Sequence, residues 1–370
     1  MMRSLSLFLV GLVSAVNISE IPPFVRPSFP ISTIDNDGTH AGRYDVRKTM
    51  VWLDEENPDN LNSYCYFYWL TTTCGRKFHT MLAPNFFRGE TTGIFRVEDL
   101  QNFSSTGATA FAPGTGSTEF LNFRSEIQNL TSPRGGDNFT DVHISADYAG
   151  VKMDVQMTPT GKNLYIGGAG GVTISPKNGG NSNQNDYRTL VPGYSWYWGN
   201  PTLKLEGTIT VGGEKLVIDS DQSRGYFERQ WGEFGIAGGH YGYWLYLSNG
   251  ILIHGWVVGP TIEKPFGIPA WATIWHPNGI HEVLEVDNTT KGMNPWTSEY
   301  SGNNYFQDVE LNLSQRNASF NIHQVIKNGE LGPLPGTKGY NISEAYAQGD
   351  GIWENERVTF YGHLEQLSYW

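Results

Sequence analysis

Hydrophobic residues that alternate with polar ones at every second position recur along this chain. The clearest run covers residues 151–157, where Val, Met, Val and Met are separated by Lys, Asp and Gln, and similar runs lie at 203–211, 309–313, 320–322 and 358–360. Because side chains two residues apart in a strand point to the same face, this pattern predicts antiparallel strands with one buried face. Long stretches with the 3.6-residue period of a helix are nearly absent. We therefore predict an all-β fold of sandwiches or barrels.

Glycines and a polar stretch indicate how this fold is divided. Gly212-Gly213 directly follows the run at 203–211, and paired glycines predict a tight hairpin because they adopt positive φ easily. The stretch 175–186 is polar, glycine-rich and aperiodic, which predicts an exposed loop or part of the connection between two halves. A chain of 370 residues usually builds more than one core. We predict two antiparallel β-domains in tandem, 16–205 and 206–370.

The first fifteen residues have the features of a secretory signal peptide. Arg3 supplies positive charge, an apolar run follows at 5–13, and Val13-Ser14-Ala15 fits the small-residue rule for cleavage. The run is too short to span a bilayer, and no later stretch is long and apolar enough to do so. We therefore expect a secreted or lumenal protein without a membrane partner. Asn-x-Ser/Thr sequons predict a glycoprotein. The sequons begin at Asn17, Asn102, Asn129, Asn138, Asn288, Asn312, Asn317 and Asn341.

The chain has two cysteines, Cys65 and Cys74. In an oxidising compartment they would close one small loop, and we expect this disulfide. The alternative is two buried thiols, which the aromatic residues around Cys65 favour. In either case the fold must rest on a hydrophobic core rather than on a disulfide framework.

Charge and aromatic content narrow the class of partner. The formal net charge of −12 argues against nucleic acid or an anionic membrane as a partner. Aromatic residues make up 14% of the chain and charged residues only 17%, which favours an apolar, ring-shaped or sugar-like ligand. The alternative explanation is that large β-cores use many aromatic side chains.

Familiar motifs for cofactors and nucleophiles are absent. The chain has no Gly-x-Ser-x-Gly elbow and no His-Glu-x-x-His zinc motif. The glycine-rich run 167–171 lacks the Gly-Lys-Ser/Thr ending of a phosphate-binding loop. A metal site assembled from distant strands stays open as an alternative, but we expect no cofactor. The chemistry of an enzyme of this kind would come from side chains and cavity shape.

Residues 225–232 read Gly-Tyr-Phe-Glu-Arg-Gln-Trp-Gly, the densest cluster of ionisable and aromatic groups in the chain. Burying such groups without partners costs free energy, so a cluster of this kind marks either a site or a structural ion pair. The structural alternative pairs Glu228 with Arg229 or with other neighbours. The glycines at both ends predict bends at the ends of a strand.

The segment 194–232 carries a resemblance to a known family. An aromatic run at 194–198 leads into Asn200-Pro201-Thr202-Leu203, then Gly207-Thr208, the glycine hairpin and the octamer. This order resembles the Pro-x-Leu strand, Gly-Thr strand and aromatic-Asp-Arg/His-Gln-Trp-Gly motif of a lipocalin-like superfamily. That superfamily includes carotenoid hydratases, fungal kievitone hydratase and fungal Diels–Alderases. Looser matches extend over most of the mature chain.

The resemblance implies two lipocalin-like β-domains with a ligand cavity at or near their interface, and catalysis without a cofactor. Two positions depart from the family pattern. Glu228 stands where the motif usually has Asp, and Tyr64-Cys65 replace the usual paired tryptophans. The longer acid would move a proton donor, and the second change would reshape the cavity wall.

Three functions fit these observations. The first, which we favour, is a secreted fungal cyclase that forms a ring in an apolar polyketide, terpenoid or phenolic substrate. It would do so by a (hetero-)Diels–Alder reaction, with a preceding dehydration as an option. The second is a hydratase or dehydratase of a prenyl double bond, and the third is a non-catalytic binder of apolar ligands.

Glu228 would be the proton donor of a hydratase, since burial would raise its pKa while Arg229 would lower it. The sequence leaves open which effect prevails. We assign catalytic roles to Glu228, Arg229 and His254. The predicted substrate-binding residues are all aromatic: Tyr226, Trp231, Tyr243, Trp256 and Trp196.

Overall fold

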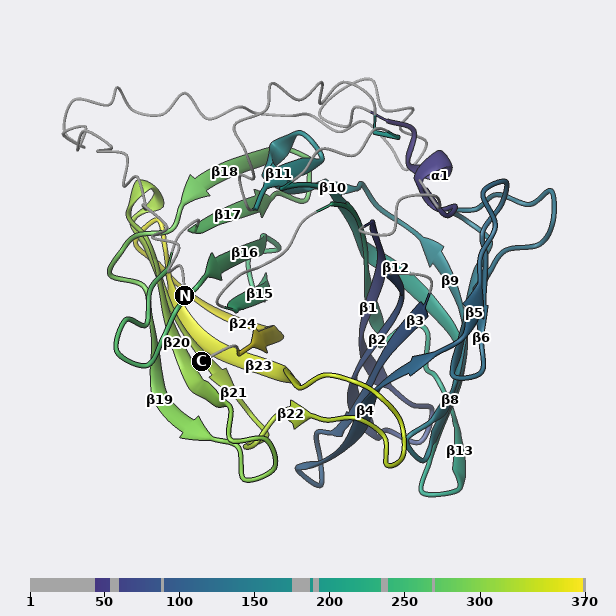
Figure 1. Cartoon of the computed structure of the whole chain (residues 1–370). Helices are drawn as coiled ribbons and strands as arrows, with labels where there is room; N and C mark the ends of the chain where they lie inside the picture. Colours follow the sequence, from purple (N-terminus) through teal and green to yellow (C-terminus); the bar gives the residue numbers. More distant parts are fainter. Residues whose placement is uncertain are drawn as a thin grey trace, which may run out of the picture.

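The computed structural model describes residues 44–53, 60–87, 90–174, 187–188, 193–233, 239–267 and 270–368. Nearly all regular structure in these residues is β, in two curled antiparallel sheets (Figure 1). The predicted all-β class is therefore confirmed. The predicted signal peptide, the sequon at Asn17 and the predicted loop at 175–186 lie outside the described residues.

The first sheet has fourteen strands. This part of the chain contains α1 Val46–Thr49, β1 Leu61–Thr71, β2 Lys77–Phe87, β3 Glu90–Asp99, β4 Ser104–Ala112, β5 Gly114–Thr115, β6 Asn122–Ser125, β7 Gln128–Thr131, β8 Val142–Tyr148, β9 Val151–Pro159, β10 Leu164–Tyr165, the 3₁₀ helix η2 Ile166–Gly168, β11 Gly171–Thr173, β12 Tyr194–Val211, β13 Glu214–Val217 and β14 Arg224–Gly232. The strand order β4-β3-β2-β1-β14-β12-β9-β8-β7-β6-β5 places β14 between β1 and β12.

The second sheet has ten strands. Its part of the chain contains β15 His240–Leu247, β16 Leu252–Val258, β17 Ala270–Trp275, β18 His281–Glu285, β19 Lys291–Thr297, β20 Asn304–Leu313, the 3₁₀ helix η3 Ser314–Arg316, β21 Ala318–Gln324, β22 Glu330–Leu331, β23 Ile342–Trp353 and β24 Glu356–Leu367. The order β18-β17-β16-β15-β24-β23-β21-β20-β19 brings the last two strands of the chain next to β15.

The change from one sheet to the other falls between Gly232 and His240, later than the predicted residue 205. β12 continues through residue 205 to Val211 and pairs there with β9 and β13. β14 then returns to pair with both β1 and β12. The segment 194–232 that carries the family resemblance therefore belongs wholly to the first sheet.

The predicted strands and the predicted hairpin are present. The run at 151–157 lies in β9, where hydrophobic residues are buried and the residues between them are mostly exposed. Gly212 and Gly213 have φ angles of 60° and 84° in the turn between β12 and β13. Gly207 interrupts the run in β12 because a Cβ there would lie 2.1 Å from the carbonyl oxygen of Asp154.

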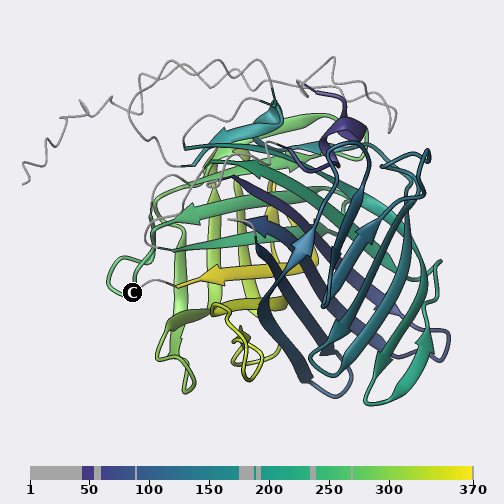
Figure 2. The same ribbon diagram turned by 45° about the vertical axis from the view of Figure 1, so that its right-hand side comes forward.

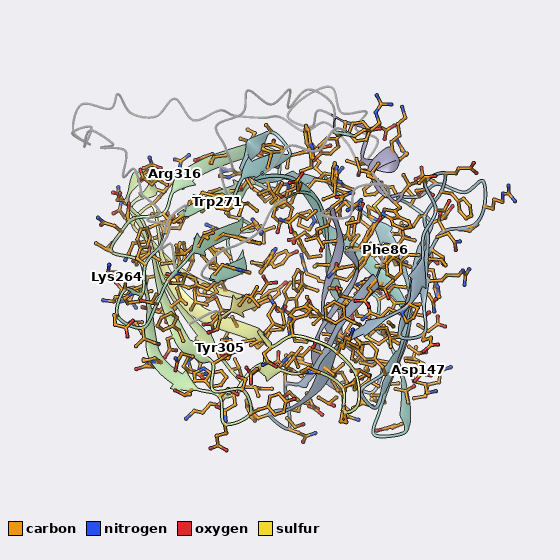
Figure 3. The ribbon with its side chains drawn as sticks, in the orientation of Figure 1. Phe86, Asp147, Lys264, Trp271, Tyr305 and Arg316 are labelled. Atoms are coloured by element: carbon orange, nitrogen blue, oxygen red, sulfur yellow. The ribbon has the colours of Figure 1, made fainter. Side chains whose placement is uncertain are left out.

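Buried hydrophobic side chains form three clusters. One is enclosed by the first sheet and includes Leu205 and Trp231, and a second is enclosed by the second sheet and includes Leu245. The third lies between the sheets and joins residues such as Tyr197 of β12 to Trp244 of β15. We call this third cluster the interface layer. Side chains fill the space between the ribbons in Figure 3, and the sheets stay side by side in the turned view of Figure 2.

The two cysteines are free thiols, so the predicted disulfide is wrong. Cys65 is buried in the middle of β1, whereas Cys74 is exposed in the turn that follows this strand. A strand advances about 3.3 Å per residue, so the extended chain after Cys65 carries the two Cα atoms far beyond the roughly 7 Å that a disulfide tolerates.

We expect one thiol to react with Ellman's reagent in the native protein and a second only after unfolding. The hydrogen bond with Thr72 lowers the pKa of Cys74, whose side chain is exposed. Burial, followed by the charge of Glu228, raises the pKa of Cys65 well above its ordinary value. Because the thiolate is the reactive form, both effects favour Cys74. If no thiol is released after unfolding without reductant, the cysteines are paired and this assignment is wrong.

Candidate active site

β14 carries the octamer, and successive side chains of this strand point alternately to its two faces. Trp231 belongs to the core enclosed by the first sheet, whereas Tyr226 belongs to the interface layer. Because side chains alternate along a strand, Glu228 shares the face of Tyr226, and Arg229 shares the face of Trp231. The acid and the base that the sequence analysis weighed as an ion pair therefore lie on opposite faces of β14.

Glu228 lies in the interface layer, where only 3% of its surface is exposed. The indole Nε1 of Trp244, from β15, donates a hydrogen bond of 2.9 Å to Glu228 Oε2. The hydroxyl of Tyr226 lies 3.5 Å from the same oxygen, and His254 Nε2 of β16 lies 3.7 Å from it. The hydroxyl of Tyr197 lies 3.1 Å from His254 Nε2. Groups from both sheets therefore converge on one carboxyl group.

Burial sets the protonation states of this cluster. It raises the pKa of Glu228 to about 8, while hydrogen bonds from Tyr197 and Trp244 lower the pKa and the charge of Glu365 raises it further. Burial lowers the pKa of His254 to about 3. At neutral pH Glu228 is therefore a carboxylic acid and His254 a neutral imidazole, so the two groups do not form an ion pair. A protonated acid in this position is suited to donate a proton.

Arg229 is buried in the first sheet and is held by backbone groups. Its guanidinium donates hydrogen bonds to the carbonyl oxygens of Thr49, Val51 and Gln230, and to the side-chain oxygen of Asn62. The rings of Tyr64 and Trp231 lie 4.2 and 4.9 Å from its central carbon. These contacts tie α1 and the chain after it to β14. The structure does not bring Arg229 to Glu228, and the predicted catalytic role for Arg229 finds no geometric support.

An Arg229→Lys variant should lose about 2–4 kcal/mol of unfolding free energy, because an ammonium group cannot make the fork of hydrogen bonds that Arg229 makes. Buried carbonyl groups would be left without donors. Urea unfolding measures this loss. Arg224→Lys, on the exposed end of the same strand, is the matched control and should change stability little. Equal stability of the two variants would contradict the structural role of Arg229.

The structure divides the other predicted residues between the site and the cores. Tyr226 and Trp256 lie in the interface layer, as does His254 by its contacts. Trp196 and Trp231 instead lie in the core of the first sheet, where their rings stack at 6.1 Å. Tyr243, which was also predicted to bind substrate, lies outside the site because it is buried in the core of the second sheet.

The sequence analysis missed Trp244 and Tyr197, although alternation could have found them. Trp244 pairs directly with His254 in the register of β15 and β16, so these side chains share a face. The prediction of Tyr243 assumed that the opposite face of β15 packs against the site. Tyr197 lies in the aromatic run before the octamer and pairs with Gln230 of β14.

A second buried group of titratable residues crosses the interface layer and was not predicted. His79 Nδ1 lies 2.8 Å from Glu98 Oε2 in the first sheet, and His363 Nε2 lies 2.7 Å from Glu344 Oε2 in the second. His363 Nδ1 and His79 Nε2 lie 3.2 Å apart and join the two pairs. These histidines are 284 residues apart in the chain, so no local motif reveals them. In the described part of the chain, no three His, Cys, Asp or Glu side chains are arranged to hold a metal ion.

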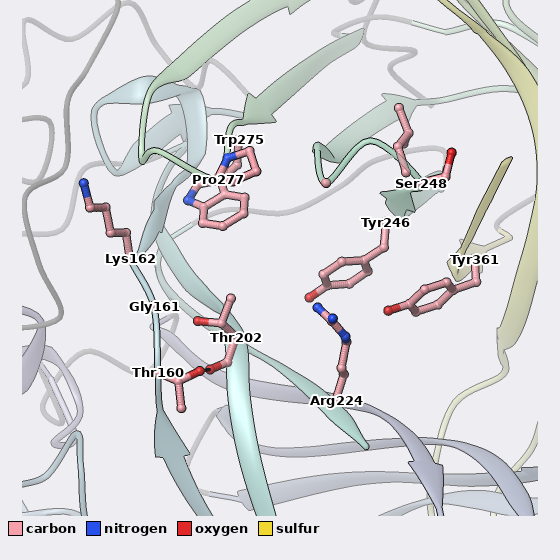
Figure 4. Close-up of a pocket in the computed structure, with 12 residues that line it drawn as sticks. Thr160, Gly161, Lys162, Thr202, Arg224, Tyr246, Ser248, Trp275, Pro277 and Tyr361 are labelled. Carbon is pink, nitrogen blue, oxygen red and sulfur yellow. Dashed lines mark hydrogen bonds between the residues drawn. The ribbon is translucent and has the colours of Figure 1, made fainter. Parts of the chain in front are cut away.

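A pocket of about 790 Å³ opens at one end of the interface layer (Figure 4). Arg224 and Tyr246 lie on one side of it, with Lys162 and Trp275 on the other. The pocket is lined by Thr160, Gly161, Lys162, Thr202, Arg224, Tyr246, Leu247, Ser248, Gly250, Trp275, Pro277 and Tyr361. Arg224 lies on the face of β14 that carries Glu228, four residues or about 13 Å away along the strand. The pocket therefore opens about 13 Å along β14 from Glu228, which is buried and does not line it.

Two curated proteins are similar to this chain in sequence, and no protein-family model matches it. Kievitone hydratase of Fusarium solani subsp. phaseoli is 22% identical over 244 residues, which cover 65% of this chain and 62% of that protein. Dehydratase asqC of Emericella nidulans is 22% identical over 226 residues, 59% of each chain. The chain thus matches about three fifths of the length of these relatives.

The fold is that of a solved hydratase. The crystal structure of kievitone hydratase from Nectria haematococca superposes with a TM-score of 0.69 at 20% identity, covering 83% of this chain and 88% of that one. This match confirms the fold of two curled antiparallel β-sheets, and together with the sequence match it confirms the resemblance to fungal kievitone hydratase. At this identity the match defines the fold, and the chemistry must be argued from the side chains.

Proposed function

We propose that this protein is an enzyme that adds water to, or removes water from, an apolar unsaturated small molecule. The observation that carries the proposal is Glu228, an acid that burial keeps protonated at neutral pH where two sheets meet. The names of the relatives, a hydratase and a dehydratase, agree with it. The titratable groups in the interface layer argue against a simple carrier, whose cavity needs only apolar walls.

Glu228 would supply the first proton, whether the reaction of the enzyme is a hydration or a dehydration. In hydration, its acidic hydrogen passes to one alkene carbon, and water attacks the cation that forms at the other carbon. In dehydration, Glu228 protonates a hydroxyl group, which leaves as water, and a base takes a proton from the neighbouring carbon so that the double bond forms. Either transfer leaves a carboxylate, which the N–H of Trp244 and the O–H of Tyr226 then stabilise. Burial that excludes bulk water strengthens both contacts.

Substrate would enter through the pocket beside Arg224. The rings of Tyr246 and Tyr361 stack at 5.5 Å and form a flat apolar wall, while Arg224 adds a positive charge near their hydroxyl groups (Figure 4). Such a wall suits a flat, electron-rich ring. The pocket volume of about 790 Å³ falls within the range of small-molecule sites.

Cyclisation is the second candidate, because the same acid and pocket serve it. Loss of water from a hydroxymethyl arene gives a quinone methide, which reacts with an alkene in a hetero-Diels–Alder step. A pocket of this volume has room for both reacting parts. The ring would then form through orientation of the two partners rather than through a nucleophile.

We propose further that the protein enters the secretory pathway and carries N-glycans. All seven described sequon asparagines are at least partly exposed, and Asn102, Asn288 and Asn317 are the most exposed of the seven. No helix in the described residues is long and apolar enough to cross a membrane. Expression in a fungal or yeast host should give a medium-borne protein that peptide N-glycosidase F shortens on a gel. An intracellular product of unchanged mobility would contradict this assignment.

The reaction type is tested by incubating the purified protein with prenylated phenols and hydroxymethyl arenes in H₂¹⁸O. Product that gains water and carries ¹⁸O supports hydration, and loss of water supports dehydration. An isomeric ring product without ¹⁸O supports cyclisation. Tight binding of the compounds without any conversion would support a non-catalytic carrier and contradict the proposed enzyme.

A further inference from the structure

Two carboxyl groups of the second sheet are placed side by side. Glu344 of β23 and Glu365 of β24 are direct cross-strand partners. Like charges directly opposite each other destabilise a sheet, and burial increases the penalty. The Glu344 side chain is fully buried, and 12% of the Glu365 side chain is exposed. Two ionised carboxylates in this arrangement are unfavourable, so one proton shared between them is expected.

Each carboxyl group of this pair has its own histidine. His240 Nε2 lies 2.5 Å from Glu365 Oε1, and His363 Nε2 lies 2.7 Å from Glu344 Oε2. The two carboxyl groups are also close enough to each other for a hydrogen bond, the contact in which a proton would be shared. His363 continues to His79 and Glu98 in the first sheet. The pair is therefore connected to a buried chain of titratable groups that crosses between the sheets.

The pair lies close to Glu228. Cys65 is the direct cross-strand neighbour of Glu228 on β1, and its thiol is within electrostatic reach of Glu228, Glu365 and Glu344. Trp244 donates to Glu228 and pairs with His363 in the register of β15 and β24. Carboxyl groups from both sheets therefore face one small region around the Cys65 thiol. Of the three, Glu365 keeps the largest exposed fraction, and it is the one that a water molecule can reach most easily.

A hydration reaction needs two proton-transfer groups. The acid gives a proton to carbon, and a base removes a proton from the water that forms the new C–O bond. His254 is held neutral by burial but lies against Glu228 itself. Glu365 lies on the second sheet, whereas Glu228 lies on the first, and His240 contacts its carboxyl group. Glu365 is therefore suited to be the base.

We propose that Glu365, held by His240 and sharing a proton with Glu344, is the second acid–base group of this site. This inference rests on the proposed hydratase or dehydratase function. In hydration, Glu228 transfers its proton to carbon, and the π electrons form the C–H bond. Water then attacks the cation, and the oxonium proton passes to Glu365. Return of one proton from Glu365 to Glu228 restores both groups. In a dehydration, Glu228 protonates the hydroxyl group that leaves as water, Glu365 takes a proton from the neighbouring carbon as the alkene forms, and the same return restores both groups.

Titratable groups from several strands face the Glu344–Glu365 pair. They include His240 on β15, Cys65 on β1, Glu228 on β14, Tyr197 on β12 and Tyr340 before β23. Burial and the charge of Glu365 raise the pKa of Glu344 well above its ordinary value. Glu344 is therefore the carboxyl group of the pair that holds the proton, and Glu365 is the one that water can reach.

A first experiment needs no substrate. Infrared spectra in D₂O at pH 7 should show the C=O band of a protonated carboxyl group in Glu228→Gln, where the acid of the proposed function is gone. The band should disappear when Glu344→Gln is added. Absence of any protonated carboxyl band in Glu228→Gln at pH 7 would overturn the shared proton, whatever the reaction of the enzyme.

A second experiment uses a compound that the wild-type protein hydrates or dehydrates. Glu365→Gln should lower kcat by about 100-fold with little change in KM, and Glu344→Gln by less, with a shifted kcat–pH profile. Glu285→Gln, exposed on β18 of the same sheet, is the control and should match the wild type. Wild-type kcat and pH profile in Glu365→Gln would overturn the role of Glu365, while loss in Glu228→Gln would leave the proposed function standing.

Discussion

A Glu228→Gln variant should lose kcat by a factor of about 10²–10⁴, the usual contribution of a general acid. Glutamine keeps the size of the side chain and can still accept the hydrogen bond from Trp244, but it has no acidic proton. Glu228 holds its proton until pH about 8, so wild-type kcat should also fall as the pH rises through that value. Steady-state kinetics between pH 5 and 10 on a hydrated or dehydrated compound measure both effects.

Tyr226→Phe is the matched control for this loss. It removes a hydroxyl that lies 3.5 Å from Glu228 Oε2, a long contact, and leaves the acid in place. We expect a small loss of kcat and a kcat–pH profile that still falls as Glu228 loses its proton. If Glu228→Gln keeps most of its turnover, the reaction depends on cavity shape rather than on proton donation. The result would favour a cyclisation that needs no acid-dependent loss of water over both the hydratase and the dehydratase.

Local patterns predicted what depends on neighbours in the chain. Alternation identified the strands, the paired glycines identified the hairpin, and the octamer identified Glu228. The same alternation implies that Glu228 and Arg229 face opposite sides of the strand, although their adjacency in the motif suggests an ion pair. Only the structure shows that Arg229 is bound by the chain around α1, a contact made across 180 residues of sequence.

Pairing between distant strands determined what the sequence could not reveal. Whether Tyr243 or Trp244 faces the site depends on which face of β15 packs against the first sheet, since both residues are aromatic and fully buried. Glu344 and Glu365 become neighbours only through the register of β23 and β24. The end of the first sheet was missed for the same reason, because the long strand β12 spans the predicted boundary and is paired along most of its length.

The pH dependence of stability should separate Glu228 from Glu282 by its sign. Burial raises the pKa of Glu228 from 4.5 to about 8. Between these values the folded protein holds a proton that the unfolded chain has lost, so folding is favoured less as the pH rises from 4.5 to 8. Glu228→Gln removes this dependence. The Glu228→Gln variant should therefore melt above the wild type, and the difference should grow as the pH rises across this range. Each kcal/mol of unfolding free energy that the variant gains corresponds to about 2–4 °C.

Glu282 provides the opposite case in the same molecule. Burial favours its neutral form, but hydrogen bonds from His276 and Arg316 outweigh burial and lower the pKa to about 2. Its contribution to folding is present above pH 4.5 and is lost as the pH falls toward 2. Glu282→Gln should therefore melt below the wild type at pH 7, and the gap should narrow in acid. Melting curves of both variants from pH 3 to 9 decide the matter. If Glu228→Gln also melts below the wild type at pH 8, its carboxyl group is ionised in the folded protein and is not the acid of the site.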